Sequence, residues 1–142
     1  MAIYVITNAL VLVNAIDLSD HCSKATCEDN RDEVDVTAFS AGGYKMMTKG
    51  LGEASITLDF FQDFAASKVH ATLQPLIGSS TPIAIEIRPV NAARSATNPA
   101  ILLAAALMFT YNGLDGKIGD AASITATFKN APTGTGMTYP TA

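Results

Sequence analysis

Alternating hydrophobic and polar positions dominate this chain and predict mostly β-structure. The pattern is clearest over residues 53–61, where every second side chain is apolar: Ala54, Ile56, Leu58 and Phe60. Such a period of two is expected of a strand with one buried face and one face in water. The same period predicts strands over residues 83–88, ended by Pro89, and over residues 121–129.

The N-terminal part is apolar on both faces. Residues 3–7 and 10–18 are rich in Val, Ile and Leu, with a turn or bulge expected at residues 7–9. Apolar side chains on both faces indicate a buried strand or a strand at an interface. No Lys or Arg precedes this stretch and Asn8 interrupts it, which favours a strand over an export signal. The stretch is also too short to span a bilayer, so no membrane insertion is expected.

The next part of the chain is more polar. Residues 20–28 resemble a strand with one wet face, and residues 29–32, which are Asp-Asn-Arg-Asp, predict a turn. A short strand is expected over residues 34–38. Residues 37–52 then predict a long, irregular inter-strand loop.

One short helix is predicted at about residues 64–74. Asp63 is a suitable N-cap, and Val69 and Leu73 lie on one side of the expected helix. Pro75 disfavours helical geometry at the residue before it, and Gly78 provides an exit.

The C-terminal part predicts a hairpin. Alanine-rich residues 101–111 could form a helix, but their β-branched and aromatic neighbours favour a strand, paired with residues 121–129. Residues 131–142 contain two prolines and two glycines and are expected to form a flexible C-terminal arm. The expected fold is therefore mainly β: a β-sandwich or barrel-like sheet with one short helix, forming a single domain over residues 1–130.

Charge and composition narrow the function classes. The chain has 142 residues, a net charge of −4 and only 15% charged residues, against about 25% in typical domains. A chain with so little charge either is well packed or has part of its surface covered by a partner. The carboxylates concentrate in residues 17–35, and no basic stripe of the kind that grips nucleic acid is present.

No arrangement of residues predicts catalysis, a metal site or a cofactor. His21, Cys22 and Cys27 are too few for a structural zinc site. The odd separation of the two cysteines predicts side chains on opposite strand faces, and therefore two free, partly buried thiols. No Gly-x-Ser-x-Gly elbow and no phosphate-binding glycine loop occurs. The chain is not expected to be an enzyme.

An apolar group lies within the predicted loop: Tyr44, Met46, Met47 and Leu51. Two interpretations remain open from these residues alone. They could cap the core of the sandwich, or they could project into a neighbouring subunit, for which adaptable methionines are well suited.

Three stretches together resemble the tail tube (major tail) proteins of long, non-contractile bacteriophage tails. They are residues 34–39 (VDVTAF), residues 58–66 (LDFFQDFAA) followed by 71–76 (ATLQPL), and residues 87–89 (IRP) with 95–99 (SATNP). The second stretch is the most specific, and the likeness runs over about residues 10–130.

The resemblance implies a structural virion protein whose copies form hexameric rings. The rings would stack into a tail tube through which double-stranded DNA passes. Partners would be other copies, the tape measure protein and the terminator protein. The location would be the virion tail, assembled in the host cytoplasm. The alternatives are another virion structural protein, such as a tail terminator or a capsid decoration protein.

The resemblance also assigns roles to particular residues. In the family, the long loop reaches the adjacent ring. The resemblance therefore implies the following candidates for inter-ring contacts: Phe39, Tyr44, Met46, Met47 and Leu51. An acidic lumen would let DNA slide past, and the candidates for its wall are Glu28, Asp29, Asp32 and Glu33.

Overall fold

The computed structural model describes residues 3–142 and contains one antiparallel sheet, with a single α-helix in this part of the chain. The strands are β1 (Leu10–Val13), β2 (Ile16–Asp17), β3 (Cys22–Asp35), β4 (Met47–Phe61), β5 (Ile83–Arg88), β6 (Ile101–Tyr111), β7 (Ser123–Asn130) and β8 (Met137–Thr138). Their order is β2-β1-β5-β6-β7-β4-β3, with β8 beside β6. The helix is α1 (Val69–Ile77), so the expected mainly-β fold with one short helix is confirmed.

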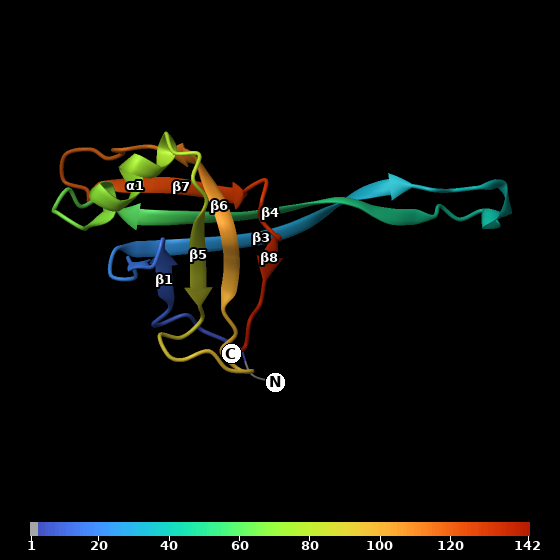
Figure 1. Cartoon of the computed structure of the whole chain (residues 1–142), viewed down its shortest axis with the longest axis horizontal. Coiled ribbons are helices and arrows are strands. Elements are labelled where there is room, and N and C mark those ends of the chain that lie inside the picture. The colour runs from blue at the N-terminus through green and yellow to red at the C-terminus, as the bar shows by residue number, and fades with distance from the viewer. Residues whose placement is uncertain (1–2) are drawn as a thin grey trace.

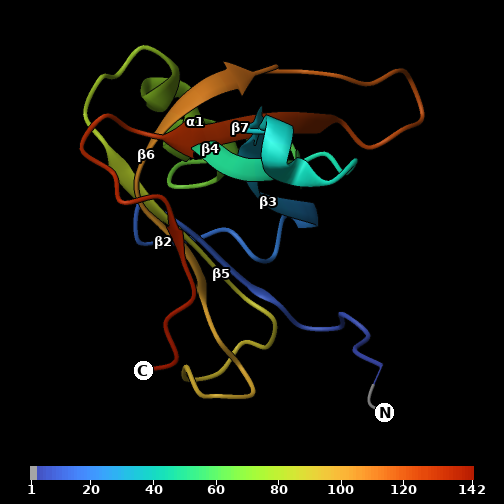
Figure 2. The same ribbon diagram turned by 90° about the vertical axis from the view of Figure 1, so that its right-hand side faces the viewer.

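The sheet folds over on itself because β6 belongs to both of its halves. The first part of β6, up to Ala106, pairs with β5, and residues 106–111 pair with β7. Strands β3, β4 and β7 therefore lie across β1 and β5, as Figure 2 shows. The two halves enclose the core, whose largest fully buried side chains include Phe60, Phe128, Leu58, Ile85 and Leu103.

Strands β3 and β4 continue well beyond the body of the molecule as a two-stranded arm (Figure 1). Here the prediction of a turn at residues 29–32 is wrong, because these residues lie inside β3 and pair with β4. The predicted loop over residues 37–52 is also too long, since β4 begins at Met47. Residues 36–46 form the tip, with a short 3₁₀ helix, η1 (Phe39–Ala41). Cross-strand pairing has overridden the local turn preference of Asp and Asn.

The N-terminal expectations are only partly met. Residues 3–9 form no strand, although residues 3–6 are apolar, and the chain bends at residues 7–8, within the predicted turn or bulge. Residues 10–17 form a hairpin instead of one long strand, because Asn14 and Ala15 turn the chain with φ values of 51° and 65°. Positive φ at both central residues is typical of a type I′ turn, which asparagine tolerates well.

The helix begins at Val69, five residues later than predicted. Asp63 does cap a backbone N–H, but that of Ala65 in a separate turn, with an N···O distance of 2.9 Å. Ser67 then has a positive φ of 62°, which no α-helix accommodates, so helical geometry can start only after it. Val69 and Leu73 do face the core as predicted.

Part of the C-terminal segment lies along the sheet. Met137 and Thr138 pair with β6, and Met137 is buried. The Ala100 N–H also donates to Pro140 O at 2.9 Å. Within residues 3–142, none of the helical segments has the length and apolar character of a membrane-spanning helix.

Candidate functional site

The tip and sides of the arm carry apolar side chains that nothing else in the described chain covers. All five residues singled out from the sequence are exposed there, and Tyr44 and Leu51 are about four-fifths exposed: the set is Phe39, Tyr44, Met46, Met47 and Leu51. Neighbouring Val34 and Val36 are exposed as well. These side chains do not cap the core of their own chain, so the first of the two open interpretations is excluded. A contiguous exposed apolar surface usually marks an interaction site.

Two glycines shape the arm. A side chain at Gly52 would meet the Arg31 guanidinium, because a Cβ there would lie 2.8 Å from Nη1. Arg31 in turn pairs with Asp29 on the same strand. On the other face, a Cβ at Gly50 would lie 2.9 Å from Val34 Cγ2. The Gly-x-Gly spacing therefore lets side chains of β3 lie flat across β4, which keeps the arm thin.

Strands β3, β4, β7 and the second half of β6 form a layer whose outward face is mostly polar and rich in threonine, although the register also places Phe61 and Leu107 on it. The register places the following residues on it: Lys24, Thr26, Glu28, Ser55, Thr57, Asp59, Thr125, Thr127 and Lys129. Two side-chain contacts join neighbouring strands on this face. Thr125 Oγ1 donates to Asp59 Oδ1 at 2.9 Å, and Lys129 Nζ lies 2.7 Å from Glu53 Oε1.

The four acidic candidates divide between the two faces of β3. The strand alternates regularly from Lys24 to Asp35, because the irregularity near Arg31 adds its extra residue to β4. Glu28 and Asp32 therefore share the outward face, and Asp32 flanks Gly50 there. Asp29 and Glu33 lie on the opposite face. An outward-facing acidic wall can thus include two of the four candidates.

Both sides of this layer end in an unpaired strand edge within residues 3–142. Strand β3 pairs only with β4 over its 14 residues. At the other side, β6 beyond Ala106 pairs with β7 alone, since its pairing with β5 stops there. Unpaired edges offer rows of free N–H and C=O groups, which natural proteins normally cover or block.

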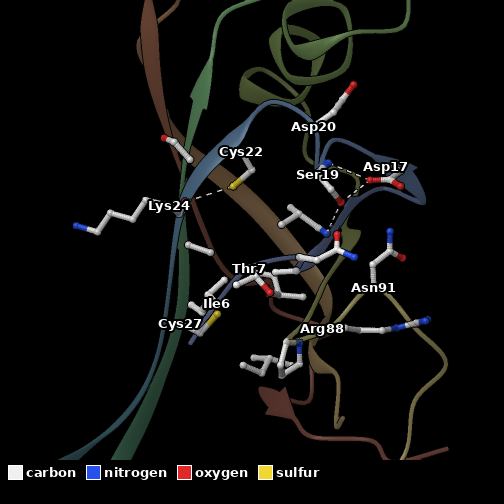
Figure 3. Close-up of a pocket in the computed structure, with 18 of the residues that line it drawn as sticks. Ile6, Thr7, Asp17, Ser19, Asp20, Cys22, Lys24, Cys27, Arg88 and Asn91 are labelled. Atoms are coloured by element: carbon white, nitrogen blue, oxygen red, sulfur yellow. Dashed lines mark hydrogen bonds between the residues drawn. The ribbon is translucent and has the colours of Figure 1, made fainter. Parts of the chain in front are cut away.

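A groove of about 1000 Å³ runs between β3 on one side and β1 and β5 on the other. Figure 3 shows Cys22 and Cys27 lining it from β3, whereas the side chain of Lys24 points away. Val11 and Ile87 form part of its floor. The sequence gives no direct sign of this groove, because its walls come from segments far apart along the chain.

The prediction that the two cysteines lie on opposite faces of a strand is wrong. They lie on the same face of β3 and not on opposite faces, because a β-bulge between Cys22 and Lys24 inserts one residue and shifts the alternation. Both are free thiols that pack against the core cluster, and burial raises the pKa of each to about 11. Within residues 3–142, no three His, Cys, Asp or Glu side chains gather in a way that could hold a metal ion.

The fold resembles known tail and tube assemblies. A chain in the virion of a native gene transfer agent particle matches with a TM-score of 0.70 and 13% identity, covering 94% of this chain and 95% of that one. A chain in the tail of an empty gene transfer agent particle, with C6 symmetry, matches with a TM-score of 0.62 and 15% identity, covering 84% and 82%. A chain in the PVC sheath–tube complex, an extracellular contractile injection system in its extended state, matches with a TM-score of 0.69 and 12% identity, covering 99% and 93%.

These likenesses establish a tail-tube-like fold. They include a contractile injection system, so the fold is not specific to the non-contractile tails that the sequence resembles. No protein-family model matches the chain, and no curated protein matches it.

Proposed function

We propose that this chain is a structural subunit of a phage tail tube. Copies would close into rings, and the rings would stack into a hollow tube for the passage of double-stranded DNA. The observation that carries the proposal is the layer with two unpaired edges, one at β3 and one at residues 107–111 of β6. Sheet closure between copies would satisfy both edges at once.

The strand directions are compatible with ring closure. Each pairing along β3-β4-β7-β6 is antiparallel, so β6 runs opposite to β3. When rotation brings the β6 of one copy beside the β3 of the next, that pairing is antiparallel too. A layer of four strands can therefore repeat around a ring without a break in the pattern. The C6 symmetry of the gene transfer agent tail supports six copies per ring.

The outward face of the layer suits a lumen. Threonine and serine hydroxyls dominate this face, and of its two lysines Lys129 pairs with Glu53, so DNA phosphates meet no cluster of cations. Glu28 and Asp32 would add negative charge that repels the phosphates. We assign these two residues to the lumen wall, and leave Asp29 to its pairing with Arg31.

The arm would join successive rings. It projects from one end of the body (Figure 1), and the exposed Phe39, Tyr44 and Met46 belong to its tip, residues 36–46. Contact with an adjacent ring would bury them. The partners would then be other copies of the chain, with tape measure and terminator proteins in the virion tail. This role is structural and requires no catalysis.

Negative-stain electron microscopy of the purified protein over a concentration series tests the proposal, with rings or tubes expected. Replacing both Met46 and Met47 by Asp should block stacking. It should change the free energy of unfolding by less than about 0.5 kcal/mol, because both side chains are about half exposed. Val90→Asp, at an exposed apolar position outside the arm and the edges, is the matched control and should assemble normally.

Two outcomes would contradict parts of this proposal. Tubes of normal length from the double aspartate variant would contradict the proposed role of the arm in joining rings. A wild-type protein that stays monomeric at high concentration would remove the tube itself. A small, stable oligomer that binds capsid shells and never polymerises would identify a decoration protein instead.

A further inference from the structure

The helix α1 carries no charged residue, although one of its sides is exposed. Its sequence contains no Asp, Glu, Lys or Arg, and Val69, Thr72 and Leu73 are buried against the sheet. The outer side presents Ala71, Gln74 and Pro75 to solvent. A surface helix normally carries charged and polar side chains on its outer side, whereas the outer side of α1 is only weakly polar, with Gln74 beside Ala71 and Pro75.

The groove beside β3 is the complementary feature. It is open and has a volume of about 1000 Å³, and Cys22, Ala25 and Cys27 form an uncharged part of its wall on β3. Ile6 and Thr7 of the N-terminal segment also line it, and Asp17 and Arg88 add charge elsewhere in the lining (Figure 3). The register puts the three β3 residues on the core-facing side of the strand. The body of the same chain covers these residues only in part.

The helix and the groove lie at the same end of the layer but at its two opposite edges, the helix beside β6 and the groove beside β3. Nδ1 of His70, on α1, lies 2.7 Å from the Tyr111 hydroxyl. Tyr111 is at the end of β6 that has the unpaired edge. Cys22 pairs with Phe60, and Phe60 pairs with Ile124, so the Cys22 end of β3 belongs to this same end of the layer.

We propose that α1 of each copy packs into the groove of the next copy around the ring. This inference rests on the proposed ring closure. Once β6 of one copy pairs with β3 of the next, α1, which packs beside β6 on the core side, comes to lie under the core-facing side of that β3. The contact buries the uncharged side of α1 against Cys22, Ala25 and Cys27, and it completes a sandwich that is open in the single chain.

The native thiols provide the test. Ala71→Cys places a third thiol on the exposed side of α1. In assembled protein, oxidation with copper–phenanthroline at pH 9 should join it to Cys22 or Cys27 of the neighbouring copy. Non-reducing electrophoresis should then show a ladder of covalent oligomers up to the full ring. Gln74→Cys, one turn further along the same side, is a second variant in case the first one assembles poorly.

Three controls make the result specific. The ladder should vanish when Cys22 and Cys27 are both replaced by Ser in the Ala71→Cys chain. Ala96→Cys, an equally exposed alanine in the loop between β5 and β6, should give no ladder. Circular dichroism and microscopy of each variant confirm that folding and assembly are retained.

The outcomes separate this inference from the proposed function. Tubes that form normally, but show no linkage from either α1 position, overturn the helix-in-groove contact and leave the tube intact. A ladder from Thr48→Cys, on the arm, would show that an arm fills the groove, and would also overturn the inference. Absence of rings and tubes in the wild-type protein overturns both.

Discussion

His21 Nε2 lies 2.9 Å from Asp63 Oδ2, which joins the segment just before β3 to the segment just after β4. The other ring nitrogen, Nδ1, lies 2.8 Å from Asp20 Oδ1. Two carboxylates therefore approach the same imidazole ring, one at each nitrogen. Lys68, 3.5 Å from Asp20 Oδ2, completes the cluster at the start of α1.

This cluster predicts a loss of stability in acid. The hydrogen bond from the Ala65 N–H, together with His21, holds the pKa of Asp63 below its ordinary value of 3.8. The hydrogen bond with His21 does the same for the pKa of Asp20. The unfolded chain therefore binds these protons first as the pH falls. The stabilisation is complete above pH 3.8 and is lost as the pH drops through the folded-state pKa values.

Asp63→Asn should make this acid-induced loss shallower, as measured by thermal unfolding midpoints at a series of pH values. Asp115→Asn is the matched control, because Asp115 is exposed and makes no ion pair within residues 3–142. The control should keep the wild-type slope. If the Asp63→Asn chain kept it too, the cluster would not contribute to the acid sensitivity.

The turn between β1 and β2 predicts a stabilising substitution. Ala15 has a φ of 65°, a conformation in which the Cβ of an L-residue is crowded by backbone and which glycine adopts freely. Ala15→Gly should raise the free energy of unfolding by about 1 kcal/mol. Chemical denaturation measures the change.

The matched control for that substitution is Ala96→Gly, at an exposed alanine whose φ is not positive. It should lower stability by about 0.5–1 kcal/mol through the greater freedom of glycine in the unfolded chain. The same sign of change at both positions would mean that backbone strain at Ala15 is absent.

The buried thiols predict slow chemistry. Burial raises the pKa of Cys22 and Cys27 from 9.0 to about 11, so near neutral pH the reactive thiolate is roughly 100-fold scarcer than for a free cysteine. Alkylation with iodoacetamide should be slow at pH 8 and should accelerate as the pH rises toward the pKa. Mass spectrometry follows both sites, with free glutathione as the reference.

Assembly adds a second expectation for these thiols. If α1 of a neighbouring copy fills the groove, alkylation at a fixed pH should be slower in tubes than in dilute, unassembled protein. Equal rates in the two states would argue against a covered groove. Rates equal to those of glutathione in the unassembled protein would contradict the burial itself.

The strands that have one wet face and one buried face were predictable from the order of residues alone. Residues 53–61, 83–88 and 121–129 all form strands as their period of two predicts, because burial of one face imposes that period directly. The hairpin of residues 101–111 with residues 121–129 is confirmed for the same reason. The exposed apolar residues of the arm were also identified from the sequence, because they lie in a predicted loop and not in a periodic element.

Features that depend on pairing between distant segments were not predictable from the order of residues and are visible only in the folded chain. Asp29 and Asn30 have strong local turn preferences, but β4 pairs with them and extends β3 into the arm. One bulge places Cys22 and Cys27 on the same face, which no count of residues along a strand reveals. Backbone hydrogen bonds across strands outweigh local preferences of this size, and a single inserted residue reverses every side chain beyond it.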